Sequence, residues 1–214
     1  NKAFPFMAVG ECNMNNIPAR RFRISFSGEL AYEVNVPAAS GEPAWLELLE
    51  AGKERGVTPY GTEPRGTMRI EKVHVAGSEL DGRPTALDLG LDGMANREKH
   101  FIGKQLSQRP AMLAEGRLQV VGLKSLEPGR NLRIGAHLVD DKVKLDSVSQ
   151  SQGHVSATTY SPSLKCGIAL GLLKDGASRH GEQIDAVFPL DDETLRVEVC
   201  HPVFIDPKGE LVRA

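Results

Sequence analysis

The sequence predicts a β-rich α+β fold in two domains. Residues 21–36 alternate between apolar and polar side chains around a bend, as a pair of strands does. Residues 43–52 carry apolar side chains at helical spacing. Beyond residue 117, short apolar runs are separated by turn residues, which is typical of an antiparallel barrel or sandwich. We therefore expect an α+β domain over residues 1–112 and an antiparallel all-β domain over residues 113–214.

The strand pair lies within the segment RISFSGELAYEVNV, residues 23–36. Alternation across the pleat places Tyr32 on the apolar face, where we expect it in the core, and Glu33 on the opposite face. A solvated strand face is the ordinary explanation for a carboxylate at such a position. The alternative is a ligand site, because both oxygens of a carboxylate can accept from adjacent N–H donors of a guanidine, a guanine or a pterin.

Helices are expected after the strand pair. The first begins near Ser40 and packs on the sheet through its apolar face. The second covers residues 65–72, where Arg65 and Arg69 are one turn apart and point from the same side. An exposed helix face explains these arginines as well as a binding site does, since a guanidinium fork binds the carboxylate of a ligand or of another side chain. A short helix is expected over residues 101–108.

The all-β domain follows a connector near residues 109–115. Its strands are expected where apolar residues gather between glycine-rich turns. The expected strands are residues 118–123, 132–139, 167–173, 184–188 and 195–199.

Charge and cysteine usage exclude several classes of function. The chain has 26 basic and 28 acidic residues without a block of like charge, so neither nucleic acid nor a membrane surface is an expected partner. Cys12, Cys166 and Cys200 are far apart and show no CxxC spacing, which indicates reduced thiols in a cytoplasmic protein. No apolar stretch is long enough to cross a bilayer, and the first four residues do not begin a signal peptide.

Motifs for common cofactors and nucleophiles are missing from the sequence. Neither GxGxxG nor GxxxxGK[ST] occurs, so flavin or nicotinamide binding has no support in these residues. The histidines form no metal-binding array, and no GxSxG elbow is present. We expect no metal site and assign no catalytic residue.

Five segments spread over nearly the whole chain carry a family resemblance: RISFSGELAYEVNVP (23–37), PYGTEPRGTMRIEK (59–72), FIGKQ (101–105), GHVSATTYSPSLKCGIALGLL (153–173) and HPVFIDPKGE (201–210). They resemble the tetrahydrofolate-binding T-protein family of the glycine cleavage system, the aminomethyltransferases. Within that family the chain is most similar to the C-terminal region of heterotetrameric sarcosine oxidase alpha subunits, which the ending HPVFIDPKGE favours. The resemblance implies a partial folate-binding α+β domain followed by an antiparallel β-barrel.

The resemblance also implies roles for particular residues. Glu33 matches the family's acidic residue that binds the pterin ring, and Arg65 matches an arginine of the folate site. Arg69 and Glu71 match the same helix pattern, where an internal ion pair or helix positioning is expected. Phe26 departs from the family, in which tyrosine is frequent, so any phenolic hydrogen bond there is lost. We expect Glu33 and Arg65 to line one folate cavity.

The family's catalytic aspartate belongs to a segment upstream of the strand pair, and nothing in residues 1–22 matches it. We therefore expect that the chain lacks the first part of its folate domain, and that the isolated fragment is inactive. The implied function is capture of the one-carbon unit of oxidised sarcosine as 5,10-methylenetetrahydrofolate, with tetrahydrofolate as cofactor. Flavins and NAD would be bound in other parts or subunits of the parent complex, whose other subunits are the expected partners.

Two other functions stay open. The chain could be a stand-alone aminomethyltransferase that takes a methylene group from a carrier-bound donor. It could instead be a non-catalytic family member that serves as an assembly scaffold, because fold alone does not establish function.

Overall fold

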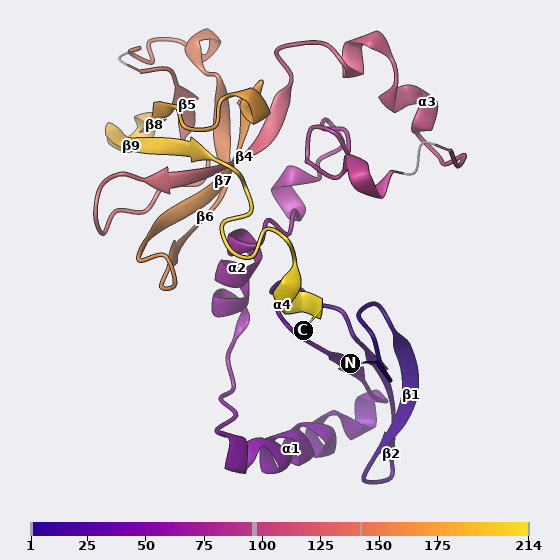
Figure 1. The fold of residues 1–214 in the computed structure, drawn as a ribbon. Coiled ribbons are helices and arrows are strands. Elements are labelled where there is room, and N and C mark those ends of the chain that lie inside the picture. The colour runs from indigo at the N-terminus through magenta and orange to yellow at the C-terminus, as the bar shows by residue number, and fades with distance from the viewer. Residues whose placement is uncertain (1, 96–97, 142, 214) are drawn as a thin grey trace. The chain divides into compact units, whose positions relative to one another are not determined.

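The computed structural model describes residues 2–95, 98–141 and 143–213. The chain divides into two compact units. One comprises Asn1–Arg69 with Asp206–Ala214, and the other comprises Ile70–Ile205. The predicted β-rich α+β fold with an antiparallel barrel is confirmed (Figure 1).

The first unit contains a three-stranded antiparallel sheet in the order β1-β2-β3. Asn15 and Asn16 join β1 (Val9–Met14) to β2 (Ile17–Phe22) with φ angles of 45° and 70°. Asparagine tolerates this left-handed backbone, which a two-residue hairpin turn requires. The hairpin was not foreseen from the sequence.

The third strand is short, and the strand pair differs from its prediction. Glu33–Asn35 forms β3, which pairs with β2, but the first predicted strand was wrong beyond Phe22. Residues 23–32 lie outside the strands because Arg23 turns inward: its side chain is 1% exposed and donates through Nη1 to the carbonyl oxygen of Phe4 at 2.8 Å.

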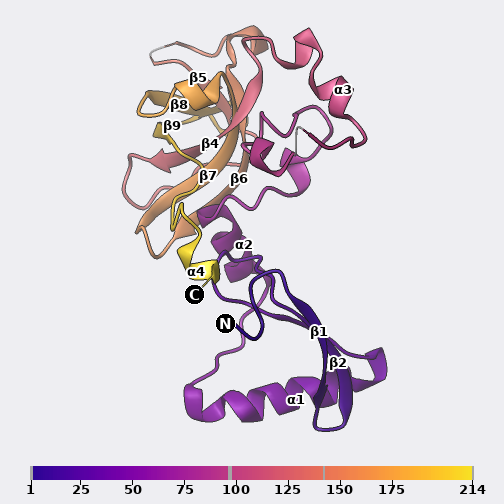
Figure 2. The same cartoon turned by 45° about the vertical axis from the view of Figure 1, so that its right-hand side comes forward.

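The predicted helices of this unit are present as α1 (Gly41–Gly52) and α2 (Thr62–Glu71), of which Ile70 and Glu71 belong to the barrel unit. The expected packing of α1 on the sheet was wrong for most of its apolar face. Ala44 is buried, but Trp45 and Leu48 are about half exposed. The helix instead contacts the β1–β2 turn, where Asn15 donates to Glu47 at 2.5 Å (Figure 2).

A short helix, α4 (Glu210–Arg213), ends the described part of this unit. Asp206 begins it by accepting hydrogen bonds from the backbone N–H groups of Glu210 and Leu211 at 2.9 and 3.0 Å. These bonds satisfy donors that a helix start leaves without intrahelical partners.

The second unit is built around a closed barrel in which neighbouring strands are antiparallel, in the order β4-β7-β6-β5-β8-β9. Valine, leucine, isoleucine and alanine side chains from every strand fill its interior. The strands are β4 (Leu118–Ser125), β5 (His137–Val139), β6 (Gly153–Ser161), β7 (Cys166–Lys174), β8 (Gln183–Phe188) and β9 (Glu193–Cys200).

Strand β6 is missing from the sequence prediction because its residues are largely polar. Its hydroxyls are satisfied inside the barrel wall: Ser156 donates to the carbonyl oxygen of Leu170 at 3.1 Å, and Thr158 donates to that of Ile168 at 3.3 Å. The pairing with β7 shifts register between Val155 and Ala157. A polar strand is therefore buried at little cost, since its hydrogen-bonding groups have partners.

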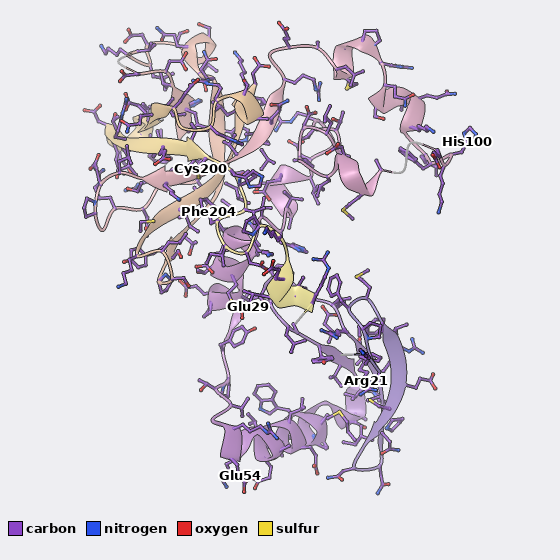
Figure 3. All side chains as sticks on the ribbon, viewed as in Figure 1. Arg21, Glu29, Glu54, His100, Cys200 and Phe204 are labelled. Atoms are coloured by element: carbon purple, nitrogen blue, oxygen red, sulfur yellow. The ribbon has the colours of Figure 1, made fainter. Side chains whose placement is uncertain are left out.

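Two other elements of this unit are shorter than predicted. The strand expected at 132–139 is limited to β5, although Leu132 and Ala136 are buried in the barrel. The helix expected at 101–108 is limited to α3 (Lys104–Ser107). Figure 3 shows Cys200 at the end of β9 and Phe204 in the segment that follows it, and both pack against Gly122.

Candidate functional site

Arg65 lies on α2 with its side chain exposed. Its guanidinium carbon is 4.1 Å from the centroid of the Phe26 ring, which is a cation–π contact. In the described part of the chain Arg65 has no carboxylate partner and no hydrogen-bond acceptor. Its N–H donors are therefore available to a ligand.

The segment that carries Phe26 is fixed at both ends. Arg23 is buried at its start, where its backbone N–H donates to the carbonyl oxygen of Ala8 at 2.9 Å. Gly28 is buried at its other end with φ of 81°, a backbone conformation that favours glycine. Phe26, which is half-buried, thus lies between two buried residues of the same segment.

Glu33 opens β3 and is paired in register with Phe22 of β2. Its side chain is exposed and has no hydrogen bond or ion pair among the described residues. Both carboxylate oxygens can therefore accept from the N–H edge of a planar ligand.

Tyr32, which precedes Glu33, is 50% exposed, so its expected place in the core was wrong. The physical reason is that its ring stacks on an aromatic neighbour at the surface. The ring centroids of Tyr32 and Phe4 are 6.3 Å apart with an angle of 22° between the planes. The guanidinium of Arg21 also lies over the Phe4 ring, with its carbon 4.3 Å from the ring centroid.

Glu33 and Arg65 belong to the same compact unit, but neither lines the two larger cavities found among the described residues. A cavity of about 390 Å³ in this unit borders the sheet and is lined by residues that include Glu11, Arg20 and Asn35. A cavity of about 300 Å³ in the barrel unit lies between residues 85–95 and 101–113. Neither is lined by Glu33 or Arg65, so their shared pocket stays a prediction.

Glu71, at the end of α2, has a structural environment. It is buried and accepts a hydrogen bond of 2.5 Å from the hydroxyl of Ser161. Its carbonyl oxygen accepts from the backbone N–H groups of Phe204 and Ile205 at 2.9 and 3.1 Å. These bonds fix the last turn of α2 against the barrel wall, in agreement with the helix-positioning role expected from the sequence.

The structure also bears on the other candidate chemistries. Cys12, Cys166 and Cys200 are free thiols, as the sequence predicts. Within residues 2–95, 98–141 and 143–213, no group of three or more His, Cys, Asp or Glu side chains is arranged to hold a metal ion. No helix of that same part is long and apolar enough to cross a membrane.

Comparisons with known families match both halves of the chain. The family model described as the GCVT N-terminal domain matches residues 1–99, and that of the glycine cleavage T-protein C-terminal barrel domain matches residues 119–206. The second match covers the barrel from Gln119, the second residue of β4, through the end of β9. The chain belongs to the glycine cleavage T-protein family.

Similar proteins fall into two groups. The chain is 41% identical to sarcosine oxidase subunit alpha of Rhizobium meliloti over 97% of its own length and 21% of that protein. It is 33% identical to an aminomethyltransferase of Thermosynechococcus vestitus over 92% of its own length and 50% of that protein. The chain thus spans about a fifth of the sarcosine oxidase alpha subunits it matches.

A solved structure supports the fold. The crystal structure of glycine cleavage system aminomethyltransferase T from Bartonella henselae matches with a TM-score of 0.79 at 20% identity. The match covers 97% of this chain and 54% of that one.

Proposed function

We propose that this chain is the tetrahydrofolate-binding part of a sarcosine oxidase alpha-type subunit, with residues 1–112 as the folate-binding domain. The proposed activity is capture of the one-carbon unit from oxidised sarcosine as 5,10-methylenetetrahydrofolate. The higher identity to the sarcosine oxidase relatives than to the aminomethyltransferases supports this branch. The parent enzyme is an oxidoreductase, its other subunits are the partners, and its flavins and NAD are bound outside this chain. Free thiols support a cytoplasmic location.

The observation that carries the proposal is the lack of internal partners for Glu33 and Arg65 among the described residues. An exposed carboxylate whose two oxygens are both available fits the paired N–H donors of a pterin edge. An arginine whose donors are equally available fits an acceptor oxygen of the same ligand. The two side chains thus offer the acceptor and donor groups that tetrahydrofolate would need.

Bound tetrahydrofolate supplies two nitrogen nucleophiles for the one-carbon unit. Glu33 accepts hydrogen bonds from the heterocycle and sets its orientation. Arg65 donates to the ligand and limits its rotation. Neither side chain reacts covalently, because holding reactive atoms in place supplies a large share of a rate advantage.

The test replaces one carboxylate oxygen of the site by a donor. Glu33→Gln in the complete native protein places an amide opposite a ligand N–H, and we expect tetrahydrofolate to bind about 10- to 150-fold more weakly by titration calorimetry. Glu54→Gln is the matched control, because Glu54 is an exposed carboxylate in the turn that follows α1.

A second measurement separates the proposed activity from simple binding. With sarcosine as substrate, Glu33→Gln should release more formaldehyde and form less 5,10-methylenetetrahydrofolate than the native protein. If Glu33→Gln binds tetrahydrofolate as tightly as the native protein, the assignment of Glu33 to the folate site is wrong. Methylene transfer from a carrier-bound donor, without oxidation of sarcosine, would favour the aminomethyltransferase alternative.

A further inference from the structure

Phe26 contacts the arginine that the proposed function assigns to the ligand. The guanidinium of Arg65 lies over the ring face at 4.1 Å, and the two residues come from different segments of the same unit. Arg65 is exposed and has no ion-pair partner among the described residues, so the ring is the contact recorded for its guanidinium. A long side chain without such a contact would populate many rotamers.

We infer that Phe26 is a positioning residue for Arg65, an inference that rests on the proposed folate site. The ring takes up one face of the planar guanidinium and leaves the N–H groups along its edge directed away from the ring. The stacked arginine keeps its hydrogen-bond donors while losing conformational freedom before the ligand arrives. Less entropy is then lost when the ligand binds.

Buried residues lie on both sides of Phe26 in the chain. Arg23 donates to the carbonyl oxygen of Phe4 at 2.8 Å, and Gly28 is buried with φ of 81°. Phe26 is itself half-buried, whereas Arg65 is an exposed side chain on α2.

The inference explains why phenylalanine serves at this position. The contact uses the face of the ring, which phenylalanine and tyrosine share, and needs no phenolic hydroxyl. Leucine has similar bulk but no aromatic face. The pair of variants Phe26→Tyr and Phe26→Leu therefore separates ring stacking from simple packing.

The experiment measures the dissociation constant of tetrahydrofolate for the complete native protein and its variants. We expect Phe26→Leu to weaken binding about two- to fivefold and Phe26→Tyr to leave it unchanged. In an Arg65→Gln background, Phe26→Leu should cause no further weakening, because the contact between the ring and the Arg65 guanidinium is already removed. Phe188→Leu is the matched control, since it removes a similar contact to Arg133 in the barrel, with the guanidinium 5.3 Å from the ring centroid.

Each outcome of these binding measurements either supports or overturns one of the two proposals. Equal weakening by Phe26→Leu with and without Arg65 would show a merely structural role and overturn the inference. So would unchanged binding by Phe26→Leu while Glu33→Gln and Arg65→Gln both weaken it. Unchanged binding by Glu33→Gln and Arg65→Gln would instead overturn the proposed folate site itself, so the two failures are distinguishable.

Discussion

Arg117, the residue before the first barrel strand, forms an ion pair with the buried carboxylate of Asp88. The carboxylate of Asp88 is 2% exposed, and Arg117 donates to it through Nη2 at 2.5 Å and through Nε at 3.1 Å. Thr85 adds bonds from its backbone N–H and its hydroxyl at 2.7 and 2.9 Å. Since the carbonyl oxygen of Asp88 also accepts from Val120 of β4 at 2.8 Å, this pair ties the preceding loop to the barrel.

Removing the cation should destabilise the protein. Arg117→Met leaves the Asp88 carboxylate buried without its charge partner, and we expect the free energy of unfolding to fall by about 2 kcal/mol. This figure is below that for breaking a fully buried pair because the Arg117 side chain is 20% exposed. Urea denaturation measures the change. Arg83→Met is the control: Arg83 pairs with Asp81 at the surface, and its removal should leave stability nearly unchanged. Equal effects would contradict the prediction.

The same pair should give the protein an acid-dependent stability. Burial opposes ionisation of Asp88, but hydrogen bonds from Arg117 and Thr85 outweigh it and lower the pKa of the carboxyl below its ordinary value of 3.8. A carboxyl whose pKa is lowered by folding stabilises the folded state at pH values above its ordinary pKa. This contribution is lost as the pH falls through the pKa of the folded state. The stability difference between the native protein and Arg117→Met should therefore narrow in acid. A constant difference from about pH 7 to about pH 2.5 would refute this.

Gly153 at the start of β6 should not tolerate a side chain. A Cβ at this position would overlap the carbonyl oxygen of Leu172 on the neighbouring strand. Because the backbone sets the position of a Cβ and the carbonyl oxygen is itself a backbone atom, no rotamer change relieves the clash. We expect Gly153→Ala to lower the free energy of unfolding by at least about 3 kcal/mol or to prevent folding.

Gly41 provides the matched glycine control. It starts α1 with φ of −61°, and a Cβ there meets no atom within 4 Å. Gly41→Ala should be neutral or slightly stabilising, since alanine favours helices. Thermal unfolding followed by circular dichroism compares the two variants, and a stable Gly153→Ala protein would show that β6 can shift.

Cys200 should react slowly with thiol reagents. Burial raises the pKa of its thiol to about 11. Because the thiolate is the reactive form, the thiolate fraction at pH 8 is about 100-fold below that of a thiol with the ordinary value of 9.0. Stopped-flow labelling of the native protein, with Cys200→Ser to identify the phase, measures this. If Cys200 is labelled as fast in the folded protein as in urea, the predicted protection of its thiol by burial is wrong.

The barrel was predictable where its strands show a continuous apolar run or a regular alternation of apolar and polar residues. The runs 118–123, 167–173, 184–188 and 195–199 all lie within strands of the barrel. β6 was missed because its serine and threonine residues break the apolar pattern that marks a buried strand. They can be buried because their hydroxyls donate to the backbone of the neighbouring strand, as Ser156 does to Leu170. Local patterns do not reveal a partner that lies in another strand.

The first unit was harder to predict because its side chains are fixed by contacts between distant segments. The alternation that suggested a strand through Phe26 is real, but burial of Arg23 against Phe4 ends the strand earlier. The hairpin had an available signal in Asn15-Asn16, since asparagine favours its left-handed turn. Glu33 and Arg65 came from family resemblance, and the stacking of Arg65 on Phe26 had no local signal.

Because of its register shift, β6 contributes side chains to two different hydrophobic clusters. Val155, before the shift, joins the residues inside the barrel, whereas Ala157, after it, joins the outer cluster around Ile70. In a regular strand these two side chains would face the same way. Ser156 is the extra residue that reverses the strand's sidedness midway, so deleting it would exchange inside for outside along half of β6.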